Sequence, residues 1–106
     1  MKHCYFTNFL TEDALNIVSS QFHLEKCTFK DIYSDAFDGD FVVGEISNSS
    51  FNGLGNDAID VSGSDLIVNN VIISNAGDKG ISAGENSKMK LSRVEISNSE
   101  IAIAGK

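Results

Sequence analysis

The chain repeats itself about every 22 residues, and this period limits what it can fold into more than any other feature. A short motif recurs at intervals of 22 positions, and its five copies begin at Asp13, Asp35, Asp57, Lys79 and Ile101. Three of these copies open with Asp-Ala followed by a large apolar residue. A fixed period of this size indicates a stack of equivalent structural units.

Within each repeat, apolar and polar residues alternate. Leu15 and Ile17, like Phe22 and Leu24, are separated by one polar residue, and Gly, Asn, Asp and Ser interrupt the short runs. This alternation predicts strands bounded by turns, and no segment shows the apolar spacing of a helix. Three short strands per repeat predict an all-β, right-handed parallel β-helix of about 4–5 rungs, each of 22–23 residues.

Each strand should pair with its equivalent one rung later, at a spacing of about 4.8 Å, so equivalent residues should form columns. The expected interior columns are Leu15-Phe37-Ile59-Ile81-Ile103, Leu24-Ile46-Val68-Leu91, Phe29-Phe51-Ile73-Ile96 and Phe9-Ile32-Leu54. Steps of 23 are expected where a polar turn holds one extra residue, at positions 8–12 and 84–88. Asn75 and Asn98 fall on equivalent corners and predict a hydrogen-bonded asparagine ladder.

Several rungs have the pattern of a known superfamily. They are Asn56 to Ser64, Gly77 to Ser82, and the Ile-Ser-Asn sequences that end at Asn75 and Asn98. These stretches resemble rungs of the pectate-lyase-like β-helix superfamily, in particular the generic repeat regions of bacterial surface and carbohydrate-active proteins. The resemblance covers nearly the whole chain and implies the fold. The superfamily includes lyases, hydrolases, epimerases and non-catalytic stalks, so the resemblance does not imply one chemistry.

The length predicts one domain over residues 1–106, with about 4.7 rungs. Stacked-repeat proteins usually carry atypical capping repeats at their ends, and none is visible in this sequence. Two interpretations follow: the chain is a segment of a longer β-helix, or its ends are covered by another copy. Exposed edges of parallel strands attract further strands, so end-to-end self-association is expected in either case.

The net charge of −7 argues against nucleic acids and anionic membrane surfaces as partners. No apolar run is long enough to span a bilayer, and the first residues do not form a signal peptide. The resemblance implies a parent protein that is extracellular or on the cell surface.

The two cysteines, Cys4 and Cys27, fall on one column in adjacent rungs. The expected distance between their α-carbons suits a disulfide, but parallel Cα–Cβ directions orient the sulfur atoms poorly. Buried thiols are therefore the first interpretation and a disulfide the second. With no Cys-x-x-Cys motif and two histidines, a zinc site is not expected.

Acidic residues form the best candidate site. The candidate metal ligands are Asp35, Asp38, Asp57 and Asp60, which stack in two columns. Carboxylates about 5 Å apart repel each other. Three interpretations remain open: turn amides and water satisfy the carboxylates, a bound Ca²⁺ neutralises them, or two of them form a catalytic pair. Lys79 could pair with Asp57 at the end of its column.

The superfamily's lyases use Asp-bound Ca²⁺ with an Arg or Lys base, and its hydrolases use clustered Asp as acid and base. Here the rungs have nearly constant length, so no long loop can enclose a cleft. Arg93, His3 and His23 lie on other parts of the rung, and His23 should point outward as a solvated strand residue. The expected function is therefore a structural or polysaccharide-binding module without catalytic activity. A polysaccharide lyase or hydrolase and a ligand-free spacer are the alternatives.

Overall fold

In the computed structural model, residues 5–9, 15–19 and 21–105 are described, and every regular element among them is a strand. The strands are β1 (Tyr5–Phe9), β2 (Leu15–Val18), β3 (Gln21–Glu25), β4 (Thr28–Ile32), β5 (Phe37–Asp40), β6 (Val43–Leu54), β7 (Ile59–Ser62), β8 (Asp65–Ala76), β9 (Lys79–Ala83), β10 (Lys88–Ser97) and β11 (Ile101–Gly105). The described part of the chain contains no helix that could cross a membrane.

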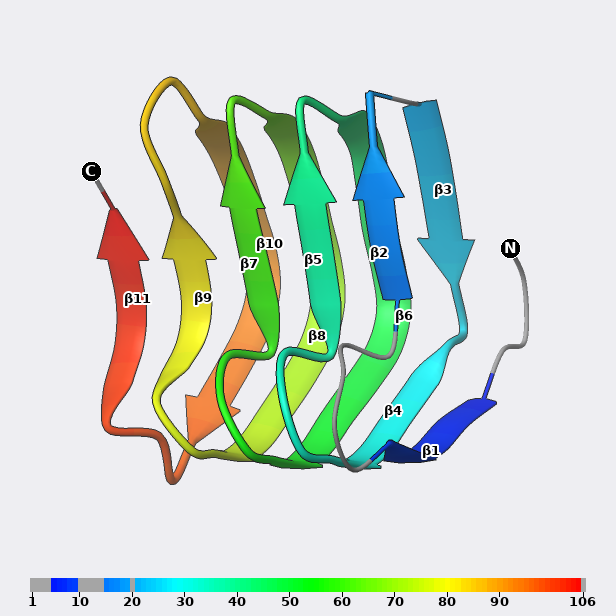
Figure 1. Ribbon diagram of the computed structural model, residues 1–106, viewed down its shortest axis with the longest axis vertical. Coiled ribbons are helices and arrows are strands. Elements are labelled where there is room, and N and C mark those ends of the chain that lie inside the picture. The colour runs from blue at the N-terminus through cyan, green and yellow to red at the C-terminus, as the bar shows by residue number, and fades with distance from the viewer. Residues whose placement is uncertain (1–4, 10–14, 20, 106) are drawn as a thin grey trace.

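The strands form two parallel sheets that face each other. One sheet has the order β11-β9-β7-β5-β2, and the other has the order β1-β4-β6-β8-β10, with β3 also paired to β6. The chain passes from one sheet to the other and back in every turn, so it winds as a right-handed parallel β-helix of about four turns (Figure 1). The predicted fold class is therefore confirmed.

The pairing register confirms the predicted columns, but Ile103, which was expected in the interior, is 51% exposed on the last described rung. Leu15 pairs with Phe37, Phe37 with Ile59, and Ile59 with Ile81, each step being 22 residues. Along β10 the step is 23, because one extra residue lies between Ala83 and Lys88, as predicted. The step returns to 22 in β11, so the corner after Ser97 is one residue shorter, a compensation that the column analysis had not identified.

The predicted second and third strands of a rung are separate in one turn and continuous in the next ones. β3 and β4 are interrupted at Lys26 and Cys27, whereas β6, β8 and β10 each run through the corresponding bend without a break. Asn48, Asn70 and Arg93 make that bend with φ values of 52–55°. A left-handed residue turns the strand while the flanking amides stay paired to the neighbouring rungs.

Such left-handed residues form three columns, which mark three corners of the coil. The columns are Ser19-Phe41-Gly63-Asn86, Lys26-Asn48-Asn70-Arg93 and Asp31-Gly53-Asn75-Asn98, with φ between 50° and 69°. Asparagine is one of the few residue types that tolerates this conformation. The predicted ladder is confirmed: Asn98 donates to Asn75 over 3.2 Å, and Asn70 similarly donates to Asn48 over 2.7 Å.

The core runs along the axis of the coil between the two sheets. Its largest side chains are fully buried aliphatic and phenylalanine residues from consecutive rungs. The rings of Phe29 and Phe51 lie parallel, with centroids 4.6 Å apart and planes inclined by 4°. Apolar side chains in a column are thus buried by contact with the apolar side chains of neighbouring rungs. Each fully buried side chain contributes roughly 1.5–3 kcal/mol to the free energy of unfolding.

The backbone of Gly55 packs directly against the preceding rung, so a side chain at this position should destabilise the protein. The Gly55 amide donates to the Ile32 carbonyl over 2.6 Å, and a Cβ at this position would overlap the Tyr33 carbonyl group. Gly55→Ala should therefore force the two rungs apart, lower the free energy of unfolding by about 1–3 kcal/mol and lower Tm in a thermal melt. Asn56→Ala, at the exposed neighbouring position, is the control and should leave Tm nearly unchanged.

Candidate functional site

The structure brings three of the four predicted metal ligands together. One carboxylate oxygen from each of Asp35, Asp57 and Asp60 lies within 4.8 Å of the others. Asp35 and Asp57 precede β5 and β7 on one column, and Asp60 projects from β7 beside them. Asp38 is paired in register with Asp60 but is not part of this group. Asp13, at the start of the column, lies outside the described residues.

The column aspartates are engaged by the backbone. The Asp57 amide donates to Asp35 Oδ1 over 3.0 Å, and the Lys79 amide donates to Asp57 Oδ1 over the same distance. Both side chains are buried, with 6% and 5% of their surface exposed. This geometry agrees with the interpretation in which each aspartate satisfies a turn amide of the following rung.

Lys79 does not form the expected ion pair with Asp57. Its ammonium group lies 3.0 Å from the carboxylate of Asp78, its neighbour in the chain, and only its backbone amide contacts Asp57. The adjacent carboxylate is within easy reach at a partly exposed corner. The hydrogen bond to Asp78 and the charge of Asp57 raise the pKa of Lys79, so the residue remains cationic.

Two of the three aspartates, Asp35 and Asp57, differ from ordinary surface carboxylates in their protonation. Burial raises the pKa of Asp35 from 3.8 to about 7, partly offset by the hydrogen bond from the Asp57 amide. The charges of Asp60 and Asp57 and a side-chain hydrogen bond with Asp60 raise it further. Burial also raises the pKa of Asp57, opposed by the Lys79 amide and ammonium group. A proton on Asp35 therefore relieves part of the repulsion that a cation would otherwise neutralise.

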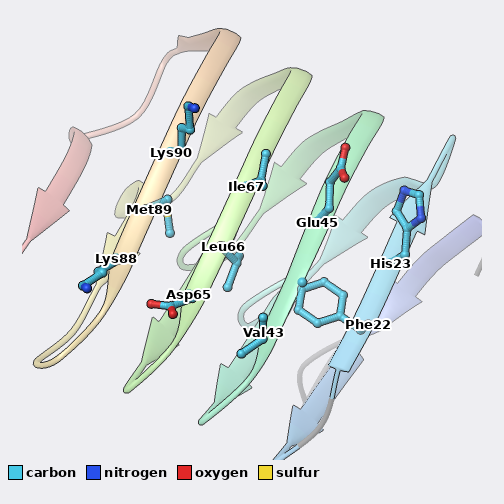
Figure 2. A pocket seen from close by; sticks show the side chains of 11 residues that line it. Phe22, His23, Val43, Glu45, Asp65, Leu66, Ile67, Lys88, Met89 and Lys90 are labelled. Atoms are coloured by element: carbon cyan, nitrogen blue, oxygen red, sulfur yellow. The ribbon is translucent and has the colours of Figure 1, made fainter.

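A second candidate site lies on the other sheet, where the strands β3, β6, β8 and β10 form an open hollow of about 500 Å³ (Figure 2). We call it the β3–β10 groove. Its lining residues come from four consecutive rungs and are Phe22, His23, Val43, Gly44, Glu45, Asp65, Leu66, Ile67, Lys88, Met89 and Lys90. The groove therefore crosses the strands and runs along the axis of the coil.

The groove combines apolar surface with charges of both signs. Ile67 lies near its centre on β8, with 47% of its surface exposed. Glu45 and Asp65 supply carboxylates on the two middle strands, and Lys88 and Lys90 supply ammonium groups on β10. His23 is exposed on β3, as predicted from the alternation. This mixture suits a ligand that has both apolar faces and hydrogen-bonding groups.

The groove was not predicted from the sequence, although the 22-residue repeat shows which outward residues stack on one another. The four positions on one column are occupied by His23, Glu45, Ile67 and Lys90. These four residues differ in chemical class, whereas each interior column keeps one class from rung to rung. That difference is the sequence signal that could have indicated a functional surface. The hollow itself depends on the size and direction of the outward side chains, which the period does not reveal.

Of the two cysteines, Cys27 is among the described residues and Cys4 is not. Cys27 is buried, and its thiol lies 3.5 Å from the Glu25 carbonyl oxygen, to which it can donate. Its amide is bonded to the hydroxyl of Ser49 on the next rung. Cys4 lies outside the described residues, so the choice between thiols and a disulfide stays a prediction.

Comparisons with the models of known protein families, with curated proteins and with solved structures find no match to this chain.

The raised pKa of Asp35 generates a prediction about pH. The folded protein binds this proton more tightly than the unfolded chain, in which the pKa lies near 3.8. This contribution to stability is complete below about pH 4 and is lost as the pH rises through 7. Thermal melts should therefore show a higher Tm at pH 5 than at pH 8, by the equivalent of at least about 1 kcal/mol.

Asp35→Asn should remove most of this pH dependence, because the amide oxygen still accepts the Asp57 hydrogen bond but the group no longer ionises. Asp65→Asn, at an exposed position on β8, is the control and should retain the dependence. Equal pH profiles for the wild type and Asp35→Asn would show that another group controls the effect.

The predicted Ca²⁺ site can be tested at pH 8, where proton competition is weakest. Ca²⁺ requires six to eight oxygen ligands, whereas two of the three clustered aspartates are buried and each gives one oxygen to a backbone amide. We therefore expect Tm to differ by less than about 1 °C between millimolar Ca²⁺ and EDTA. A clear rise that Asp60→Asn abolishes would establish a cation site.

Proposed function

We propose that this chain is a non-catalytic β-helix module that binds an extended polysaccharide along the β3–β10 groove. The observation that carries the proposal is the groove itself, to which four consecutive rungs contribute side chains. We further propose that the module belongs to the pectate-lyase-like superfamily and to a bacterial surface or carbohydrate-related protein.

The spacing of the strands supports a polymer as the ligand. Neighbouring rungs are about 4.8 Å apart, so the groove offers side chains at regular intervals along the axis of the coil. Equivalent outward positions are filled by Val43, Asp65 and Lys88 on three consecutive strands. A chain of sugar rings extended along the axis can contact each rung in turn and sum several weak contacts.

The chemistry of the lining supports a sugar more than a purely apolar ligand. Sugars present apolar C–H faces and hydroxyl groups that both donate and accept hydrogen bonds. Ile67 and the exposed Val43 offer surface to the faces, while Glu45 and Asp65 accept and Lys88 and Lys90 donate. The opposed charges leave the groove without a strong net charge, which favours a neutral polysaccharide.

The lyase or hydrolase alternative has less support in the geometry. The aspartates that would act as acid, base or Ca²⁺ ligands lie on the other sheet, away from the β3–β10 groove. Asp35 and Asp57 are buried and accept backbone hydrogen bonds, and the nearby Lys79 is paired with Asp78. These groups are satisfied by their own rungs, so they are poorly placed to reach a substrate.

The proposal predicts binding that depends on the centre of the groove. Native gels containing β-glucan, xylan, polygalacturonate or chitosan should reveal retardation of the wild type by a neutral polysaccharide, and calorimetry with its oligosaccharides should give an affinity. Ile67→Ser should weaken that affinity about fivefold or more, because an exposed side chain at the centre of a contact contributes about 1 kcal/mol or more.

Ile72→Ser is a matched control for this experiment. Ile72 lies on the same strand, β8, and is similarly exposed at 51%, but it is not part of the groove. The Ile72→Ser variant should bind the polysaccharide with the affinity of the wild type. Failure of the wild type to bind any of these polysaccharides, or equal losses in both variants, would contradict the proposal.

A further inference from the structure

Phe41 has a backbone conformation that its side chain disfavours. Its φ is 56°, in the left-handed region where a bulky residue is a genuine outlier. The same corner of the other rungs is occupied by Ser19, Gly63 and Asn86, all of which have smaller side chains than Phe41. Among the residues that the structure describes, Phe41 is the one apolar side chain with a positive φ.

Burial does not compensate for this strain. Phe41 is 68% exposed, whereas the following residue, Val42, is completely buried in the core. Most of the ring therefore faces solvent at the corner between β5 and β6. The coil requires a positive φ at this corner in each of these rungs, so the unusual feature is the bulky apolar residue there. Residues in such disfavoured conformations cluster at binding sites.

One side of the ring packs against the next rung. A Cβ built on Gly63 would lie 2.6 and 2.7 Å from two carbon atoms of the Phe41 ring, so the ring lies against the backbone at Gly63. The glycine leaves the space that the ring occupies. An exposed ring packed in this way loses little conformational entropy when a ligand stacks on it.

Phe41 does not line the β3–β10 groove but lies next to its edge in the chain. Phe41 stands two residues before Val43, and Gly63 stands two residues before Asp65, and both Val43 and Asp65 line the groove. On the other side of the corner, Ser62 donates to the Asp40 carboxylate over 2.7 Å. The residues that precede Phe41 and Gly63 in the chain, Asp40 and Ser62, therefore supply polar groups at the same corner.

We propose that Phe41 is a stacking platform for a sugar ring and extends the β3–β10 groove around the corner of the coil. The inference rests on the proposed polysaccharide-binding function and names the residue that contributes most to its affinity. A sugar fits better than an apolar peptide because this part of the chain also carries hydrogen-bonding groups, from Asp40 and Ser62 at the corner and from Asp65 at the edge of the groove.

The repeat itself supplies the variants that test this inference. Phe41→Asn and Phe41→Gly introduce the residues that stand at positions 86 and 63 of the same column. Both variants should weaken binding of the polysaccharide that retards the wild type by about tenfold. Their Tm should be unchanged or raised by up to about 5 °C, because the left-handed conformation suits Asn and Gly.

Two controls complete the experiment. Phe41→Tyr keeps an aromatic face and should retain binding. Tyr33 is 70% exposed and lies outside the groove, so Tyr33→Asn should bind as the wild type does. Loss of binding that is confined to the Phe41→Asn and Phe41→Gly variants would support the stacking platform.

The possible failures are distinguishable. If the wild type binds a polysaccharide and Phe41→Asn binds it equally, the role of Phe41 is wrong while the proposed function stands. If the wild type binds none of the polysaccharides, both proposals are wrong. If Phe41→Asn and Phe41→Gly lower Tm by several degrees together with binding, the ring is a structural element and the stacking role is wrong.

Discussion

Parallel pairing between residues one rung apart is the interaction on which the rest of the structure depends. Every strand of the described chain pairs with its equivalent 22 or 23 residues away. This pairing satisfies the backbone and places each side chain directly above its counterpart. The identity of one residue therefore constrains the residue above it. The effect of a substitution on stability depends first on the side chains directly above and below it in the same column. Corners obey the same rule, since Ser49 and Ser64 accept amides of the preceding rung.

Stacking has opposite consequences for apolar and acidic columns. Phenylalanine and aliphatic residues gain contact area when they stack on their own kind, as the parallel rings of Phe29 and Phe51 show. Aspartates on one column repel each other, and burial adds a desolvation cost. Backbone amides donate to Asp35 and Asp57 and so offset part of this cost. Burial also raises the pKa of Asp35 to about 7, and the proton that Asp35 then binds removes its charge. A conspicuous acidic pattern can therefore arise from the architecture without a ligand.

Departures from the repeat are more informative about function than the repeat itself. The outward face of β3, β6, β8 and β10 varies from rung to rung, and that variation produces a groove with apolar, acidic and basic parts. Phe41 departs from its column in the same way, at a cost in backbone strain that glycine avoids and asparagine tolerates at the same corner of other rungs. Phe41 lies two residues before Val43, which lines the groove, and the proposed polysaccharide site therefore combines them.

The sequence by itself determined the period, the interior columns, the extra residue before Lys88 and the asparagine corner ladder. These features follow from spacing along the chain, because parallel pairing converts a separation of 22 or 23 residues into direct contact. Only the tertiary structure decided that Asp60 joins Asp35 and Asp57 while Asp38 does not, that Lys79 pairs with Asp78, and that one sheet forms a groove. Those outcomes depend on the twist of the sheets and on the direction of each side chain. The period specifies which residue lies above which, but it does not specify how far a side chain reaches across the rung.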